Sequence, residues 1–164
     1  MPVNIHPYNN KYRDTVTSLI CSIQRNEFEV DITLEDQPDL KNIESFYQNG
    51  QGNFWIAFVN EELAGTIALL DIGNHQVALR KMFVREKFRG KEYGVGLSLL
   101  KTLFSWAAEK DYKEIFLGTT EKFIAAQRFY EKNGFEEIEK QKLPENFPVM
   151  NVDVKFYRYV VSSL

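Results

Sequence analysis

The segment best suited to chemistry is a glycine-rich turn at residues 83–96, FVREKFRGKEYGVG, which joins a strand pattern to a helix pattern. Backbone N–H groups at the start of a helix have no partner inside the helix, and the helix dipole adds partial positive charge there. Glycines let the backbone approach a phosphate closely, and Arg89 and Lys91 can add charge-assisted hydrogen bonds. The turn is therefore typical of a pyrophosphate-binding loop, although a glycine-rich turn without a ligand can have the same composition.

A second segment, residues 125–135, carries a tyrosine within a helix pattern. Ala126 and Tyr130 lie four residues apart and thus share one face of the predicted helix. The small Ala126 allows a ligand to pass close to that face. Gly134 is suited to end the helix, and Phe135 begins the next strand. An ordinary amphipathic helix with a capping glycine is the alternative interpretation.

Together the two segments resemble the cofactor-binding signatures of the GNAT superfamily of N-acetyltransferases. The turn lacks the Gly-Lys-Ser/Thr of a Walker A loop and the Gly-x-Gly-x-x-Gly of a dinucleotide site. Its run Val-x4-Arg-Gly-x3-Gly is similar to the coenzyme A pyrophosphate loop of the superfamily, and Ala-x3-Tyr-x3-Gly-Phe is similar to the second signature. Two positions depart from the family pattern: Glu92 replaces a usual glycine, and Phe123 replaces an asparagine that often contacts pantetheine, a contact that Thr119 or Thr120 can supply. The matching residues are Val84, Arg89, Gly90, Gly94, Ala126, Tyr130, Gly134 and Phe135.

The resemblance implies transfer of an acetyl group from acetyl-coenzyme A to a primary amine, on a small molecule or a peptide, by direct attack in a ternary complex. In the family, backbone groups of the strand before the turn bind the pantetheine arm, and one N–H stabilises the oxyanion. Tyr130 matches the usual general acid, which protonates the departing thiolate; the alternative is that it only packs or hydrogen-bonds to the sulfur. The expected cofactor-binding residues are Met82, Val84, Arg89, Gly90, Lys91, Glu92, Tyr93, Gly94, Val95, Gly96 and Ala126.

The residue that removes the proton of the acceptor amine is left open. Many relatives use a glutamate on the strand before the turn, where this chain has Ala78. The acidic segment 27–39 matches the part of the family that borders the acceptor site. Its carboxylates Glu27, Glu29 and Asp31 can hold a cationic amine or act through a water, and a solvated acidic loop is the alternative. The segment favours a cationic acceptor such as a polyamine, an amino sugar or lysine.

The elements that position these residues alternate between strand and helix patterns. We predict one acetyltransferase domain, residues 1–164, of the α+β class. Its mixed, mostly antiparallel central sheet is flanked by helices in the order β-α-α-β-β-β-α-β-α-β-β, with the cofactor in a cleft where central strands splay. The expected strands are 3–6, 53–59, 63–71, 76–84, 114–117, 135–140 and 152–160, and the expected helices are 11–28, 40–48, 97–107 and 122–133.

Composition excludes several functional classes. The net charge of −3 and the pI near 5.5 argue against a nucleic-acid partner. The longest apolar run, 54–59, is too short to cross a membrane, and residues 1–8 lack the pattern of a signal peptide. The single cysteine, Cys21, rules out an internal disulfide, and no Cys/His cluster has metal-ligand spacing.

We therefore expect a cytoplasmic enzyme that uses acetyl-coenzyme A and no metal. A homodimer can form by pairing of the last strand, 152–160, across two chains. Two alternatives remain: a non-catalytic coenzyme A-binding module, and an acyltransferase for a different acyl group.

Overall fold

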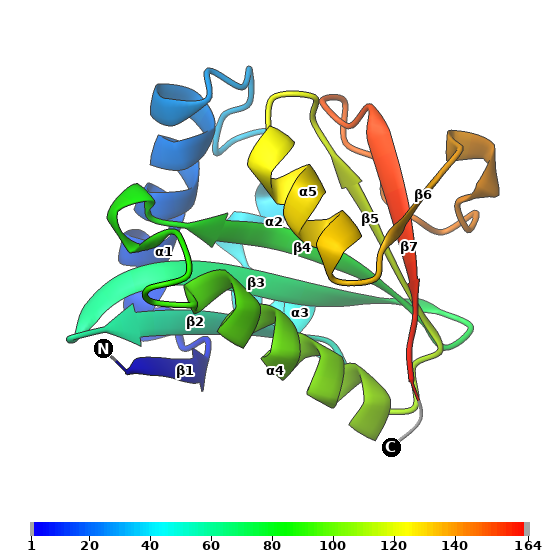
Figure 1. Ribbon diagram of the computed structural model, residues 1–164, viewed down its shortest axis with the longest axis horizontal. Helices are drawn as coiled ribbons and strands as arrows, with labels where there is room; N and C mark the ends of the chain where they lie inside the picture. The colour runs from blue at the N-terminus through cyan, green and yellow to red at the C-terminus, as the bar shows by residue number, and fades with distance from the viewer. Residues whose placement is uncertain (1, 163–164) are drawn as a thin grey trace.

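The computed structural model describes residues 2–162, which form one seven-stranded sheet with helices on both faces (Figure 1). Neighbouring strands are antiparallel except for the central pair β4 and β5, which is parallel. The prediction of an α+β fold with a mixed, mostly antiparallel sheet is confirmed. In spatial order the strands are β1 (Val3–Pro7), β2 (Asn53–Val59), β3 (Glu62–Gly73), β4 (Gln76–Val84), β5 (Glu114–Thr119), β7 (Lys155–Val160) and β6 (Glu136–Ile138).

The helices lie in two groups. In the described part of the chain, α4 and α5 cover one face of the sheet, and α1, α2 and α3 cover the other (Figure 1). The predicted helix 40–48 is interrupted at Asn42, where ψ is 54°, so two short helices replace it. The predicted helix 11–28 changes to a π-helical turn, Ile23–Glu27, after α1 ends. The helices are α1 (Arg13–Ser22), α2 (Pro38–Lys41), α3 (Ile43–Tyr47), α4 (Val95–Glu109) and α5 (Ile124–Lys132).

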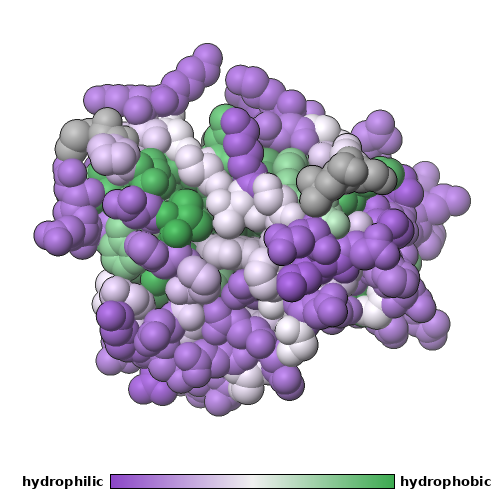
Figure 2. Space-filling view, turned by 90° about the horizontal axis from the view of Figure 1, so that it is seen from below, coloured by the Kyte–Doolittle hydropathy of each residue, from purple (hydrophilic) through white to green (hydrophobic). Residues whose placement is uncertain are grey.

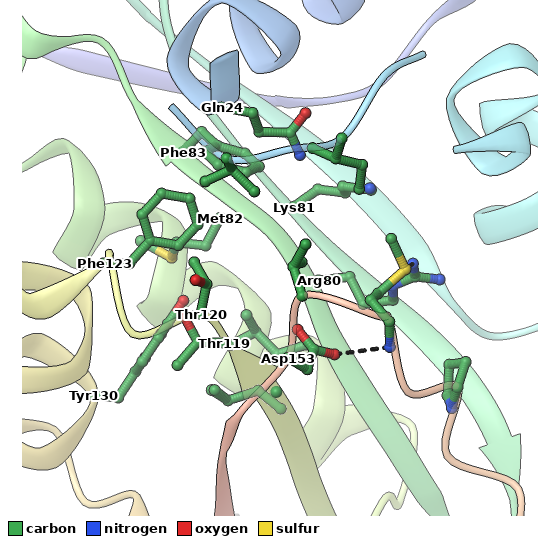
Figure 3. A pocket seen from close by; sticks show the side chains of 18 of the residues that line it. Gln24, Arg80, Lys81, Met82, Phe83, Thr119, Thr120, Phe123, Tyr130 and Asp153 are labelled. Atoms are coloured by element: carbon green, nitrogen blue, oxygen red, sulfur yellow. Dashed lines mark hydrogen bonds between the residues drawn. The ribbon is translucent and has the colours of Figure 1, made fainter. Parts of the chain in front are cut away.

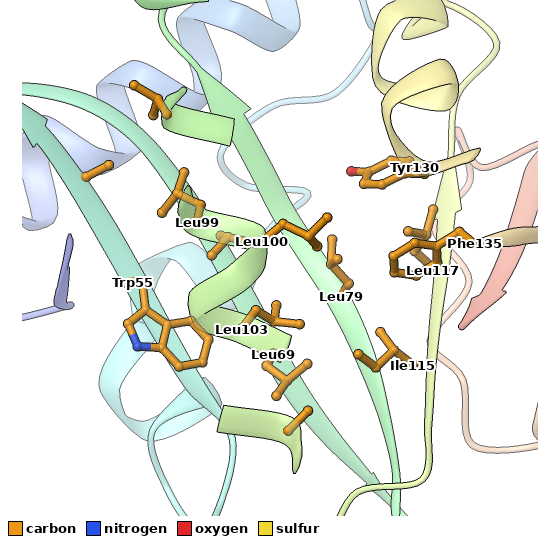
Figure 4. Close-up of a cluster of buried hydrophobic side chains, with 14 of the residues drawn as sticks. Trp55, Leu69, Leu79, Leu99, Leu100, Leu103, Ile115, Leu117, Tyr130 and Phe135 are labelled. Atoms are coloured by element: carbon orange, nitrogen blue, oxygen red, sulfur yellow. The ribbon is translucent and has the colours of Figure 1, made fainter. Parts of the chain in front are cut away.

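The larger hydrophobic core lies between the sheet and α4 (Figure 4). Leu99 and Leu103, one helical turn apart on α4, are fully buried in it. The ring of Trp106 on α4 meets the ring of Trp55 on β2 edge-on, with 5.8 Å between centroids. The indole Nε1 of Trp106 also donates a hydrogen bond to the carbonyl of Gln51 at 2.8 Å. These two contacts fix the C-terminal half of α4 against β2 and the residues just before it.

The surface on the side of α4 is mainly hydrophilic. Figure 2 views the molecule from below the orientation of Figure 1, and charged or polar residues cover most of that face. Among exposed residues of α4, Leu97 is 39% accessible, whereas the inward positions of the same helix are buried. The helix therefore has one apolar face, which packs on the sheet, and one face turned to water.

The two central strands separate after a short stretch of pairing. Gln76–Ala78 of β4 pair with Glu114–Phe116 of β5, and no later residues of these two strands pair with each other in the described chain. Beyond this point β4 stays paired with β3, and β5 stays paired with β7. The splayed central strands that we predicted are thus present, and they leave one edge of β4 open.

The last strand is shorter than predicted and is internal to the sheet. β7 begins at Lys155 because the residues before it form a turn, in which the Asp153 N–H donates to the Met150 carbonyl at 3.0 Å. Residues 156–158 pair with both β5 and β6. The prediction that this strand pairs across a dimer is therefore wrong for residues 156–158, because both of their edges are occupied within the chain. The homodimer itself stays a prediction.

Replacing Leu103 by alanine should lower the free energy of unfolding by about 2–5 kcal/mol, since the change leaves a cavity in a close-packed core. Urea denaturation followed by circular dichroism measures this loss. Leu97→Ala on the same helix is the control, and its cost should stay below about 1 kcal/mol because that side chain is partly in water. Equal losses in the two variants would contradict the statement that Leu103 faces the core and Leu97 faces water.

Candidate active site

A cavity opens where β4 and β5 separate (Figure 3). It holds about 100 Å³, several times the space that one water needs. β4 forms one wall and β5 the other, α5 contributes Tyr130, and the segment between β6 and β7 closes the far side. The side chains that matter below are those of Arg80, Lys81, Met82, Phe123, Tyr130 and Asp153.

The glycine-rich turn leads from β4 into the N-terminal end of α4. Gly90 and Gly94 have φ angles of +100° and +65°, and Gly94 is the residue before the helix. Because a Cβ at either position would meet no atom within 4 Å, their backbone angles are what require glycine. A Cβ on Gly96 would lie 3.4 Å from the Met82 Cε, so the start of the helix and β4 are in contact. Lys91 and Glu92 are exposed in the turn.

Arg89 is held by an acidic partner. Its guanidinium forms two hydrogen bonds with the Glu27 carboxylate, the second at 2.9 Å, and its Nε donates to the Val84 carbonyl at 2.8 Å. The guanidinium carbon also lies 5.6 Å from the centre of the Phe28 ring. This pair ties the glycine-rich turn to the end of the first helical segment, and it engages Glu27 away from the cavity.

The acidic segment 27–39 contributes mainly apolar side chains to the cavity. Its residues that line the cavity include the apolar Val30 and Ile32. Glu29 and Asp31 are exposed, and the Glu29 carbonyl accepts a hydrogen bond from Lys122 at 2.6 Å. None of the carboxylates of Glu27, Glu29 and Asp31 is among the side chains that line the cavity, because alternation along the segment turns its apolar side chains inward. For Glu29 and Asp31 this arrangement agrees with the alternative of a solvated acidic loop.

A bulge in β4 shapes the wall of the cavity. The register between β3 and β4 shifts between Thr66 and Ala68, and Lys81 has a φ of +54° at this point. The Thr66 hydroxyl donates to the Lys81 carbonyl at 2.6 Å. Because the carbonyl and N–H of one trans peptide point in opposite directions, this bond turns the Met82 N–H away from Thr66.

The side chain of Lys81 ends in a buried polar cluster. Its Nζ donates to the Gln37 side chain and lies 3.5 Å from Asp39 Oδ2, and the side chains of Lys81 and Asp39 are only 5% and 4% exposed. The Tyr47 hydroxyl donates to the same Asp39 oxygen at 2.6 Å, and the amides of Gln37 and Gln24 exchange two hydrogen bonds. Burial lowers the pKa of Lys81 to about 8, and the Asp39 carboxylate opposes this shift.

Tyr130 reaches the cavity from α5. Its side chain is buried, and it extends toward Thr119 and Thr120 in Figure 3. Burial raises the pKa of Tyr130, so the phenol keeps its proton at neutral pH and can act as a donor. Phe123, which stands where the family often has asparagine, packs edge-on against Phe28 and helps line the cavity. Thr119 and Thr120 also line the cavity, and their replacement of the asparagine contact stays a prediction.

Three charged residues of the cavity were missed from sequence, and one of them is Lys81. Arg80 lies on β4, and Asp153 lies in the turn before β7. The Asp153 carboxylate packs directly on β5, because a Cβ on Gly118 would lie 2.7 Å from its Oδ2. Burial raises the pKa of Asp153, against the opposing effects of the hydrogen bond from Met150 and the positive charges of Arg80 and Lys81. The stretch between β6 and β7 carries no local sequence signal for this contact.

Further features of the described residues concern metals and membranes. Residues 2–162 contain no group of three or more His, Cys, Asp or Glu side chains placed to hold a metal ion. Within that same range, each helix falls short of the length and apolar character that crossing a membrane requires. His75, which has a φ of +59°, lies in the turn between β3 and β4, with its Nδ1 3.2 Å from the Asp111 carbonyl oxygen.

Comparison with known proteins identifies the family. The sequence model of the acetyltransferase (GNAT) family matches residues 18–135. A GNAT-family acetyltransferase from Staphylococcus aureus has 42% sequence identity and a TM-score of 0.94, over 98% of this chain and 99% of that chain. An acetyltransferase from Streptococcus agalactiae has 32% identity and a TM-score of 0.91, over the same shares of the two chains. The chain therefore belongs to the GNAT family of acetyltransferases.

The chain is also similar to longer proteins. The N-acetylaspartate synthetase of Xenopus tropicalis is 35% identical over 104 residues, which are 61% of this chain and 37% of that protein. The chain thus matches little more than a third of the length of that relative.

Replacing Lys81 by methionine should lower the free energy of unfolding by about 3–5 kcal/mol, because Asp39 is left buried without its cation. The double variant Lys81→Met, Asp39→Asn should recover part of this loss, and urea denaturation measures both. Lys87→Met is the control. Lys87 Nζ is only 2.7 Å from Glu62 Oε1, but both side chains are exposed, so the cost should be about 1 kcal/mol or less. Similar losses for Lys81→Met and Lys87→Met would contradict the buried character of the cluster.

Proposed function

We propose that this chain transfers the acetyl group of acetyl-coenzyme A to a primary amine by direct attack in a ternary complex. The observation that carries the proposal is the opening between β4 and β5. Around this opening lie an unpaired edge of β4, the buried Tyr130 phenol and Met82, which contacts the start of α4. Membership of the acetyltransferase family supports the same reaction.

The glycine-rich turn is suited to hold the pyrophosphate of the cofactor. The first N–H groups of α4 have no partner within the helix, and the glycines leave room for a phosphate above them. Lys91 is exposed beside them, and Arg89 can turn from Glu27 to a phosphate, since both are anionic partners. The pantetheine arm would then lie along β4 from Val84 to Met82, with its amides bonded to the open strand edge.

The reaction requires a donor for the oxyanion and a proton for the departing thiolate. The amine nitrogen attacks the thioester carbonyl, the C–N bond forms and the C–S bond breaks. The Met82 N–H, turned away from Thr66 by the bulge, is the backbone group suited to stabilise the oxyanion. Tyr130 would give its proton to the thiolate as coenzyme A leaves, and its raised pKa keeps that proton in place beforehand.

For the acceptor we propose a class of amine, a small amino-acid-like molecule. The name of the relative N-acetylaspartate synthetase indicates an acetylated amino acid as its product, which supports a small amino-acid-like acceptor here. The apolar lining contributed by Val30 and Ile32 gives no support to a polycationic acceptor. A non-catalytic coenzyme A-binding module would bind the cofactor without releasing thiol, and a different acyl preference would appear when acetyl- and octanoyl-coenzyme A are compared.

Reversing the charge of Lys91 should weaken acetyl-coenzyme A binding about tenfold, because the turn then repels the pyrophosphate; this factor corresponds to about 1.4 kcal/mol. Calorimetric titration of the Lys91→Glu variant measures the dissociation constant. Lys101→Glu, an exposed site farther along α4, carries the same change in net charge and should leave the constant within about twofold. Equal weakening in both variants would show that only net charge matters.

Replacing Tyr130 by phenylalanine should lower kcat about 100-fold and leave the dissociation constant of acetyl-coenzyme A nearly unchanged, since only the proton donor is lost. Thiol release at saturating substrates measures kcat. Tyr157→Phe is the matched control, because this buried tyrosine donates instead to Glu131 at 2.7 Å. Unchanged turnover in the Tyr130→Phe variant would rule out the acid role.

A further inference from the structure

Two charged side chains of opposite sign meet at one residue on the side of the cavity opposite α4 and α5. Arg80 Nη2 donates to the Met150 sulfur at 3.2 Å, and Asp153 Oδ2 accepts the Met150 backbone N–H at 3.0 Å. All three residues line the cavity. Figure 3 shows Asp153 between Arg80 and Thr119, with Tyr130 beyond. The carboxylate is thus nearer to the catalytic end of the cavity, and the guanidinium is farther from it.

Asp153 has one oxygen available for a ligand. Its Oδ2 is engaged by Met150 and packs over Gly118 of β5, whereas Oδ1 has no hydrogen bond to any residue of the described chain. A carboxylate fixed by one oxygen presents the other in a defined direction, which suits an amine donor. Because Asp153 packs against β5, this oxygen lies at the opening between β4 and β5, where an acceptor has to approach the thioester.

Arg80 has only weak partners. Besides the Met150 sulfur, its guanidinium carbon lies 5.8 Å from the centre of the Phe46 ring. Within residues 2–162, no carboxylate lies within 4.0 Å of it, whereas the neighbouring Lys81 is paired with Asp39. A guanidinium has five N–H donors in a planar fork that matches a carboxylate, and a thioether is a poor acceptor for them. Arg80 therefore retains the capacity to bind an anionic group.

We propose that the acceptor is an amine that also carries a carboxylate, with its amine bound at Asp153 and its carboxylate bound at Arg80. This assignment rests on the proposed acetyl transfer and specifies the substrate class of the same cavity. An amine without an acid group would leave Arg80 unsatisfied in a partly buried site, which costs affinity. An acid without an amine would place two carboxylates in the same cavity.

Asp153 also accounts for the proton that the acceptor must lose. The acceptor reacts as the neutral amine, after its ammonium form has lost one proton to solvent. As the amine nitrogen bonds to the thioester carbon, one further N–H proton passes to Oδ1 of the Asp153 carboxylate. The C–S bond then breaks, and the thiolate takes the proton of Tyr130. The neutral amide and the thiol are the products, and Asp153 and Tyr130 exchange protons with solvent before the next cycle. β4 offers no base at the position where many relatives have a glutamate, because Ala78 is buried and apolar. Asp153 takes over this role.

The test compares amines that differ only in the acid group. Glycine, L-aspartate and L-glutamate are each assayed against the fully amidated form, with acetyl-coenzyme A and thiol release as the readout. We expect kcat/KM of at least one acid to exceed that of its amide by about tenfold or more, the value of one charge-assisted bidentate contact. Amine basicity alone would favour the amide, because an amidated amino acid has the less basic amine and is less protonated at neutral pH. A preference for the acid therefore has to come from binding of its carboxylate.

Variants separate the two contacts. Arg80→Gln should raise KM for the acid about tenfold and leave the amide unchanged, which removes the preference. Asp153→Asn keeps the hydrogen bond from Met150 and should lower kcat for acid and amide alike, about 100-fold. Arg128→Gln, an exposed arginine on α5, is the control and should change neither. The dissociation constant of acetyl-coenzyme A should stay the same in all three variants, which shows that they fold.

Two kinds of outcome overturn different statements. Equal kcat/KM for acids and amides in the unmodified chain, or an Arg80→Gln variant that affects both alike, would overturn the assignment of the acceptor class and leave acetyl transfer in place. Cofactor binding without thiol release for any of the six amines would also overturn the assignment of the acceptor class, whereas no binding of acetyl-coenzyme A would overturn the proposed function together with the assignment.

Discussion

The site depends on the short pairing between β4 and β5, which ends at Ala78 and Phe116. A strand edge inside a protein must find partners for its N–H and C=O groups, because unpaired buried backbone is costly. The open edge of β4 is therefore a place where an extended ligand arm can supply the missing bonds. Its position at the centre of the sheet also lets residues from both faces reach the same point. Tyr130 comes from one face, and Arg80 and Asp153 meet at the other.

The shape of that edge is maintained by contacts from distant segments. The bulge at Lys81 places a non-glycine residue at positive φ, a conformation that costs about 1–3 kcal/mol and persists only when its surroundings enforce it. Thr66 fixes the carbonyl of this residue, and Asp39 with Gln37 fixes its ammonium group. A buried ion pair adds little net stability, but it favours one arrangement over its neighbours. The polar cluster therefore specifies the geometry of the reactive strand more than it stabilises the fold.

The features that were predictable from sequence are those with local patterns. The glycine turn and the order of the strands and helices follow from patterns within short windows, and the structure confirms this order except that two short helices replace the predicted helix 40–48. Tyr130 was singled out through the family resemblance, and it lines the cavity. The contacts that hold the cavity wall and the glycine-rich turn in place were not predictable, because they join residues far apart in the chain. Arg80 and Met150 are 70 positions apart, and Arg89 and Glu27 are 62 apart. Positive φ at a lysine has no sequence signal either, since glycine is the residue that normally marks such a conformation.

The pairing of the two tryptophans has a practical consequence for spectroscopy. The chain contains two tryptophans, and Trp55 and Trp106 stack edge-on between β2 and α4, outside the set of residues that line the cavity. Their fluorescence emission therefore reports the packing of α4 on the sheet. The two indole rings do not line the opening between β4 and β5, so a ligand bound there does not touch them. Intrinsic emission is thus suited to compare the unfolding of cavity variants on equal terms, whereas ligand titrations need calorimetry or a probe placed on another element.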